Sequence, residues 1–193
     1  MSLLPGKRLN ADQESRANES KLSSHKRRNI TRNVGIKKMT IIRKYKRKDA
    51  RAVATLISRT YSRFNIREGT KEAARKYIES YDPGGKRTED IHRRFIRTPN
   101  FWVAFMGSRI VGVARGIGNR LINLFVDGAY HRQGIATRLV RRFENNCKKA
   151  GFKEIVLRGS LYATPFYQSL GYKKTTGVRN FRGLKIQSMK KKI

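Results

Sequence analysis

The chain has 193 residues, of which 38% are hydrophobic, and this content is enough for one sizeable core in a single domain with an appendage. The single cysteine, Cys147, excludes an intramolecular disulfide and a cysteine-based zinc site, and no apolar stretch approaches the ~20 residues of a membrane span. Because the N-terminus also lacks a signal-peptide hydrophobic core, we expect a cytoplasmic protein.

The net charge of +33 is spread along the whole chain. Residues 1–38 hold ten of the 46 Lys and Arg and three of the 13 Asp and Glu, so residues 39–193 carry +26. Segment 1–38 has no apolar periodicity, and we expect a disordered basic N-terminal extension before a domain at 39–193. A domain this basic predicts non-specific contact with RNA, DNA or the ribosome. The alternative interpretation is a solvated surface that also attracts an anionic cofactor.

The first part of the domain shows the hydrophobic periodicities of strands and helices. The expected elements are a strand at 39–45, helices at 49–62, 70–80 and 88–97, and strands at 100–106 and 109–117. Thr70 and Thr88 are the expected caps of the second and third helices. Gly107 and Ser108 form a hairpin signal, so the last two strands should pair antiparallel.

The next stretch changes from strand to helix. Residues 121–126 are almost unbroken apolar, which predicts a short strand buried on both faces. Residues 137–150 then follow a helical pattern, with Glu144 and the basic residues on its outer surface. The expected core stripe of this helix consists of Ala136, Leu139, Val140, Phe143 and Cys147. Gly151 stands where the helix should stop.

The C-terminal part predicts a shorter set of elements. These are a strand at 154–159, a short helix at 165–170, and a closing antiparallel pair at 172–176 and 184–189 around a loop at 177–183. The three lysines at 190–192 are expected to form a solvated end.

The turn before the 137–150 helix has the composition of an anion site. The first amides of a helix have no internal partner and carry a partial positive charge, so a phosphate can bind them. Gly134 and Ala136 leave out side chains that would block its approach, while Arg132 and the Thr137 hydroxyl can add contacts. The alternative interpretation is an ordinary strand-to-helix turn.

Two segments of the chain resemble the GNAT N-acetyltransferase superfamily. Residues 131–136, His-Arg-Gln-Gly-Ile-Ala, are similar to its acetyl-CoA pyrophosphate loop, Gln/Arg-x-x-Gly-x-Gly/Ala, although His131 replaces the first Gln or Arg. Residues 163–172 are similar to its Ala-x-x-Phe-Tyr-x-x-x-Gly-Phe segment, and Ser160 stands where an Asn is often found. The resemblance extends from about Met39 to the C-terminus.

This resemblance implies a fold and a set of binding residues. The fold is an α/β acyltransferase fold with a mixed, mostly antiparallel sheet, helices on both faces, and parallel fourth and fifth strands that splay apart at a bulge just before Asp127. The co-substrate is acetyl-CoA, with no metal. The residues expected to bind it are Leu124, Phe125 and Val126 through the strand backbone, His131, Arg132, Gln133, Gly134, Ile135, Ala136 and Thr137 in the loop, and Ser160.

The resemblance also implies a reaction. Tyr167 matches the tyrosine that faces the thioester sulfur, and the acetyl group passes to an amine by direct attack through a tetrahedral intermediate. The acceptor is a small molecule or a protein amine, the protein a monomer or homodimer, and no residue of the sequence identifies the base. The competing interpretation is a basic module that binds nucleic acid or the ribosome on the same fold, with weak or no catalysis.

Overall fold

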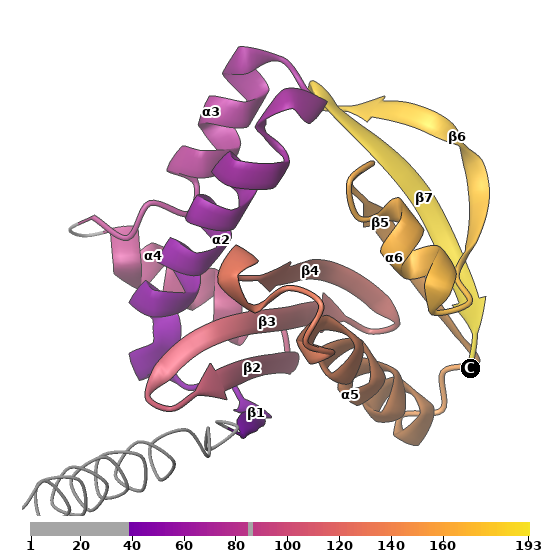
Figure 1. Cartoon of the computed structure of the whole chain (residues 1–193), viewed down its shortest axis with the longest axis horizontal. Helices are drawn as coiled ribbons and strands as arrows, with labels where there is room; N and C mark the ends of the chain where they lie inside the picture. Colours follow the sequence, from indigo (N-terminus) through magenta and orange to yellow (C-terminus); the bar gives the residue numbers. More distant parts are fainter. Residues whose placement is uncertain (1–38, 85–86) are drawn as a thin grey trace, which may run out of the picture. The chain divides into compact units, whose positions relative to one another are not determined.

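Seven strands form one mixed sheet in the part of the chain that the computed structural model describes, residues 39–84 and 87–193 (Figure 1). The strands are β1 (Thr40–Lys44), β2 (Asn100–Met106), β3 (Arg109–Ile117), β4 (Arg120–Val126), β5 (Glu154–Gly159), β6 (Lys173–Phe181) and β7 (Leu184–Lys192). Their order is β1-β2-β3-β4-β5-β7-β6, and only the β4–β5 pair is parallel. The predicted mixed, mostly antiparallel sheet is confirmed. The predicted extension, 1–38, lies outside the described residues.

Helices cover both faces of the sheet. The helices are α2 (Ala50–Phe64), α3 (Lys71–Glu79), α4 (Arg87–Ile96), α5 (Ile135–Lys149) and α6 (Thr164–Ser169), with 3-10 turns η1 (Arg47–Asp49), η2 (Ile66–Glu68) and η3 (Gly128–Tyr130). On one face, α2 and α4 pack on β2 and β3, and on the other face α5 crosses the sheet (Figure 1). The sheet therefore separates two hydrophobic cores.

The caps of α3 and α4 differ from each other. The Thr70 hydroxyl accepts a hydrogen bond from Ala73 N at 3.1 Å and caps α3 as predicted. Thr88 was expected to cap α4, but it lies inside the first turn of that helix. Its hydroxyl instead donates to the carbonyl of Pro83 at 2.7 Å, so the helix begins one residue earlier than expected.

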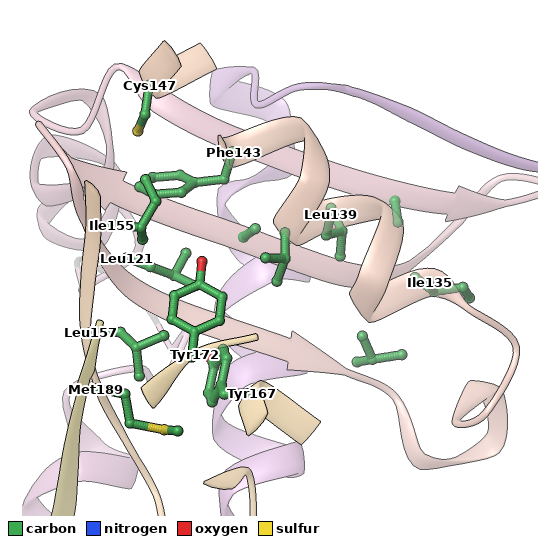
Figure 2. Packing of buried hydrophobic residues seen from close by; sticks show 14 of the residues in the cluster. Leu121, Ile135, Leu139, Phe143, Cys147, Ile155, Leu157, Tyr167, Tyr172 and Met189 are labelled. Carbon is green, nitrogen blue, oxygen red and sulfur yellow. The ribbon is translucent and has the colours of Figure 1, made fainter. Parts of the chain in front are cut away.

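The α5 core confirms the predicted stripe and corrects the position of one charged residue. Leu139, Val140 and Phe143 are fully buried, and each such side chain contributes about 1.5–3 kcal/mol (Figure 2). Glu144 was expected on the surface, but only 7% of it is exposed. Its carboxylate accepts hydrogen bonds from the Tyr172 hydroxyl at 2.9 Å and from Lys191 Nζ at 3.0 Å, so two partners distant in sequence hold it in the core.

Strand β4 was expected to be buried on both faces, but this prediction is wrong. Ile122 is 39% exposed, and Leu124 is only half-buried. Asn123 faces Arg115 of β3 whereas Leu121 faces the next residue of β3, so Ile122 is the extra residue of a bulge. This bulge lies within β4 and not just before Asp127.

The closing hairpin is longer than its predicted form. The segment 177–183 was expected to be a loop, but β6 continues to Phe181 and the turn is confined to Arg182 and Gly183. The lysines at 190–192 lie in β7 and pair with β5. Strand β7 lies between β5 and β6 and pairs with both through its backbone. This pairing holds β6 in the sheet, although the residues of β6 are almost entirely polar and exposed.

Candidate active site

The candidate site begins where the pairing of β4 with β5 ends. The two strands share register only at Arg120 with Val156 and at Leu121 with Leu157. Beyond these pairs they separate, as the resemblance implied, and a cavity of about 1010 Å³ opens between their C-terminal ends. Its walls come from α2, α3, β4, the start of α5, α6 and the β6–β7 turn.

The cavity brings together most of the residues that the sequence pointed to. The predicted residues that line it are Leu124, Phe125, Val126, His131, Arg132, Gly134, Ile135, Ala136, Thr137, Ser160 and Tyr167. Gln133 does not line it, because its side-chain amide donates to the carbonyl of Ala129 at 3.3 Å and points back along the loop. The roles of these residues in binding stay predictions.

The backbone of β4 presents alternate residues to the cavity. Asp127 N donates to Val111 O of β3 at 2.9 Å, and in an antiparallel ladder every second residue faces the same neighbour. Phe125, paired with Val113, therefore directs its N–H and C=O to β3, while Leu124 and Val126 direct theirs to the opened side. The register thus leaves the backbone N–H and C=O groups of Leu124 and Val126, and not those of Phe125, on the side that a ligand can reach.

One of these outward groups is already occupied. The ring of His131 donates from Nε2 to the carbonyl of Val126 at 2.8 Å, since a carbonyl can only accept. The same ring lies 4.9 Å from the ring of Phe64. His131 therefore holds the loop against the end of β4, which is a different role from the cation that the family pattern places at this position.

The start of α5 faces the same cavity. Gly134 is the N-cap residue, with a left-handed φ of +74° and no side-chain cap, and a Cβ there would meet no atom within 4 Å. The hydrogen bond from Arg138 N to Gly134 O, at 3.0 Å, is the first of the helix. The preceding amides, those of Ile135, Ala136 and Thr137, have no helical carbonyl to bind, and all three residues line the cavity. These amides and the open space beside Gly134 suit an anion.

Tyr167 of α6 also lines the cavity. Its ring packs on Gly159 at the end of β5, where a Cβ would come within 3.2 Å of it, and it meets the ring of Tyr172 edge to face (Figure 2). The residue is 5% exposed, and no described residue makes a hydrogen bond with its hydroxyl. Burial raises the pKa of Tyr167 well above its ordinary value, so this hydroxyl remains a hydrogen-bond donor at neutral pH.

Sequence reasoning also missed a buried polar network, in which Asn123, Tyr77 and Tyr81 form part of the cavity wall and Arg115 lies behind them. Arg115 is 8% exposed; its Nε donates to Asn123 Oδ1 at 2.9 Å, and its terminal nitrogen reaches the Tyr81 hydroxyl at 3.5 Å. Asn123 in turn donates to the Tyr77 hydroxyl at 3.2 Å. Burial lowers the pKa of Arg115, and no carboxylate of the described residues pairs with it. The wall therefore has a fixed positive charge behind it.

Glu68 is the one carboxylate among the described residues that line the cavity, and it too was not predicted. Its oxygens accept hydrogen bonds from the backbone amides of Leu161 at 3.1 Å and Tyr162 at 2.5 Å, in the loop after β5. The ring of Phe64 stacks on Tyr162 at 5.2 Å. Segment 64–70 thus connects the α2–α3 side of the cavity to the β5–α6 side.

The described residues also lack two features, a metal-binding cluster and a membrane-spanning helix. Within 39–84 and 87–193, no three His, Cys, Asp or Glu side chains come together in the manner of a metal site. Among the helices described, none is long and apolar enough to cross a membrane.

Comparison with known proteins gives relatives of one kind. A family model described as an acetyltransferase (GNAT) domain matches residues 67–193. Human N-acetyltransferase 8 is 35% identical over 101 residues, which is 45% of this chain and 44% of that protein. The chain thus matches less than half the length of this relative.

Solved structures show the same fold. A GCN5-related N-acetyltransferase of Rhodopseudomonas palustris is 18% identical with a TM-score of 0.68, covering 80% of this chain and 96% of that one. The paia N-acetyltransferase of Thermoplasma acidophilum, solved in complex with coenzyme A, is 22% identical with a TM-score of 0.64, covering 80% and 99%. With a family match that spans residues 67–193 and a sheet that opens between β4 and β5, the chain belongs to the GNAT acetyltransferase family.

Proposed function

We propose that this domain transfers the acetyl group of acetyl-CoA to an amine acceptor by direct attack, through a tetrahedral intermediate. The observation that carries the proposal is the single cavity shared by three groups: the outward backbone of β4, the N-terminus of α5 and the ring of Tyr167. The coenzyme A bound to the Thermoplasma acidophilum neighbour supports the same ligand for this cavity.

The chain's own groups fit acetyl-CoA. A diphosphate needs unpaired amides and open space, and the residues from Gly134 to Thr137 provide both. The amides of an extended pantetheine arm need a strand edge, which Leu124 and Val126 provide on the opened side of β4. The Val126 carbonyl is already bound by His131, so we expect pairing to use the Val126 N–H and the Leu124 carbonyl, which leaves the Leu124 N–H for the thioester.

Acetyl-CoA supplies an acyl group that is activated as a thioester. We assign to the outward Leu124 N–H a hydrogen bond to the thioester carbonyl oxygen, which gains charge during the reaction, and a donor of this type contributes about 2.7–4 kcal/mol to a transition state. We assign to the Tyr167 hydroxyl a hydrogen bond to the departing sulfur. An ordinary tyrosine pKa near 10 exceeds a thiol pKa near 8.5, so full proton transfer is uphill by about 2 kcal/mol, and burial raises this difference.

The acceptor amine must be neutral to attack, and the cavity favours this form. Arg115 behind the wall disfavours a second positive charge near Asn123 and Tyr77. Because Glu68 already accepts hydrogen bonds from two backbone amides, we do not assign it as the base. We assign the removal of the amine proton to a chain of water molecules instead. A small molecule or a protein amine can be the acceptor. The cytoplasmic location and the monomeric or dimeric state stay predictions.

Ligand-induced stabilisation tests the phosphate site. Acetyl-CoA at a hundredfold excess over Kd should stabilise the fold by about 2.7 kcal/mol, which raises Tm by roughly 5–10 °C. Gly134→Glu places a carboxylate on the anion site and should abolish the shift. Gly151→Glu is the matched control because Gly151 is also left-handed, with φ of +85° and open space around its Cβ, but lies past the other end of α5. This control should keep the shift.

Thiol release from acetyl-CoA across a panel of amines tests the reaction. Release above the rate of hydrolysis with at least one amine supports the proposal. If acetyl-CoA shifts Tm but no amine increases thiol release, the domain binds the ligand without transferring its acyl group to these acceptors. No Tm shift, or an equal shift in Gly134→Glu, contradicts the assigned phosphate site.

A further inference from the structure

The solvent side of α5 carries cations with no carboxylate between them. These exposed residues are Arg138, Arg141, Arg142, Lys148 and Lys149. At about 100° per residue they fall within an arc of about 120°, so they form one row along the helix. Glu144, the one carboxylate of α5, is buried and binds Tyr172 instead. Nothing on this side of the helix therefore neutralises the row.

The segment that follows α5 adds one further exposed cation, Lys153. Ile193 N donates to the carbonyl of Lys153 at 2.9 Å, so the end of β7 adjoins this segment (Figure 1). The β7 residues Lys190 and Lys192 pair with Val156 and Glu154, which alternate with the α5-facing Ile155 and Leu157, so these two lysines point to the other face of the sheet and are not part of the row. We define the basic face as the five cations of α5 together with Lys153.

The basic face differs from the other charged surfaces of the domain. None of its six side chains makes an ion pair with a described residue, whereas helices α3 and α4 interleave cations with carboxylates. Those pairs are Arg75–Glu79, Lys76–Glu72 and Arg93–Asp90, at 3.3, 2.6 and 2.6 Å. The same chain therefore uses two surface compositions, and the charge of the basic face is of the uncompensated kind.

Neither the helix dipole nor the proposed co-substrate accounts for the whole face. The dipole favours Lys148 and Lys149 in the last turn of α5 but opposes Arg138 near its start. A phosphate at Gly134 lies about 22 Å from the far end of this 15-residue helix, which exceeds the Debye length of about 8–10 Å. The lysines at the far end therefore serve another anion.

We propose that the basic face binds the phosphate backbone of nucleic acid without sequence preference. From Arg138 to Lys149 the row is about 16 Å long, which spans several phosphates of a strand. Binding at a membrane surface would need an exposed apolar face, but the apolar side of α5 is buried against the sheet through Leu139 and Phe143. Phosphate contacts need only spaced cations, and these the face provides.

The test compares two triple variants of the full chain in anisotropy titrations with a labelled mixed-sequence RNA oligonucleotide over a range of salt concentrations. Arg141→Gln, Lys148→Gln and Lys149→Gln remove three cations from the basic face. Arg75→Gln, Lys76→Gln and Arg93→Gln remove three paired cations from α3 and α4 and change the net charge equally. All six side chains are exposed, so both proteins should fold. Residues 1–38 are common to both and cancel from the comparison.

The basic-face variant should weaken RNA binding at least tenfold at moderate salt and reduce the slope of log K against log salt by about 2, while the control variant should match the unmodified chain. Equal losses in both variants would show that net charge alone governs binding and would overturn the assignment, as would no loss in either. Tighter binding to phosphatidylserine vesicles than to RNA at the same salt would also overturn it. Both variants should retain the acetyl-CoA-induced Tm shift, which separates this proposal from the enzymatic one.

Discussion

Replacement of Tyr167 by Phe removes the hydroxyl that we assign to the departing sulfur and leaves the ring in place. The ring's contacts with Gly159 and Tyr172 are made by carbon atoms, and no described residue bonds the hydroxyl, so the free energy of unfolding should change by less than about 0.5 kcal/mol. A hydrogen bond to a charged group contributes about 1.5–3 kcal/mol. Its loss in the transition state should lower kcat roughly 10- to 150-fold.

Tyr172→Phe is the matched control for this substitution. Its ring lies beside that of Tyr167, but its hydroxyl donates to the buried Glu144 at 2.9 Å, away from the proposed reaction. This variant should lose about 1–3 kcal/mol of stability and keep kcat. Thiol release and urea denaturation measure the two effects. Unchanged kcat in Tyr167→Phe, or equal losses of kcat in both variants, would refute the assigned role.

Two further predictions concern buried groups. Arg115→Met should lower the free energy of unfolding by less than about 1.5 kcal/mol, because it removes a charge that burial already disfavours. Asn123→Ala should lower it by about 3–5 kcal/mol, because the charge of Arg115 then loses its closest acceptor. Urea denaturation of both variants measures this order, and the reverse order contradicts it. The folded state raises the pKa of five tyrosines, so their neutral form contributes stability below an unfolded pKa of about 10, and this contribution is lost as the pH rises further. These residues are Tyr45, Tyr61, Tyr77, Tyr167 and Tyr172. Stability should therefore fall above pH ~10, with tyrosinate absorbance from this group appearing together with unfolding, and full ionisation in a folded chain would contradict the burial argument.

Local patterns were enough to predict the bounds of several elements. Strands Asn100–Met106, Arg109–Ile117 and Glu154–Gly159 begin and end where their apolar runs predicted, since turn residues flank each run. The stripe of α5 was also predicted, because its period repeats over 15 residues. Gly151 follows the end of that helix with a left-handed φ of +85°, a conformation that glycine adopts more readily than other residues. These features depend on residues close together in the chain.

Features that depend on distant partners were not predicted. Glu144 reads as a surface residue of an amphipathic helix, and only Tyr172 and Lys191, 28 and 47 residues away, account for its burial. The apolar run of β4 reads as a fully buried strand, but its neighbour β5 leaves it after Leu121, and the cavity replaces the missing strand. Glu68 finds its partners 93 and 94 residues further along the chain. No spacing rule connects such residues.

The difference between local and distant partners also explains why the sequence motifs located the cavity but not the site for the acceptor amine. The groups assigned to acetyl-CoA are largely backbone amides at the end of β4 and the start of α5, and a glycine-containing loop is enough to mark their position. We expect the amine to bind instead against cavity-lining side chains from α2 and α3, such as Tyr61 and Tyr77, whose rings stack at 4.1 Å. Their sequence signal is that of ordinary core positions on amphipathic helices. Their exposure to the cavity follows from the separation of β4 and β5, so acceptor choice must be tested on these aromatic residues and on Arg115 behind them.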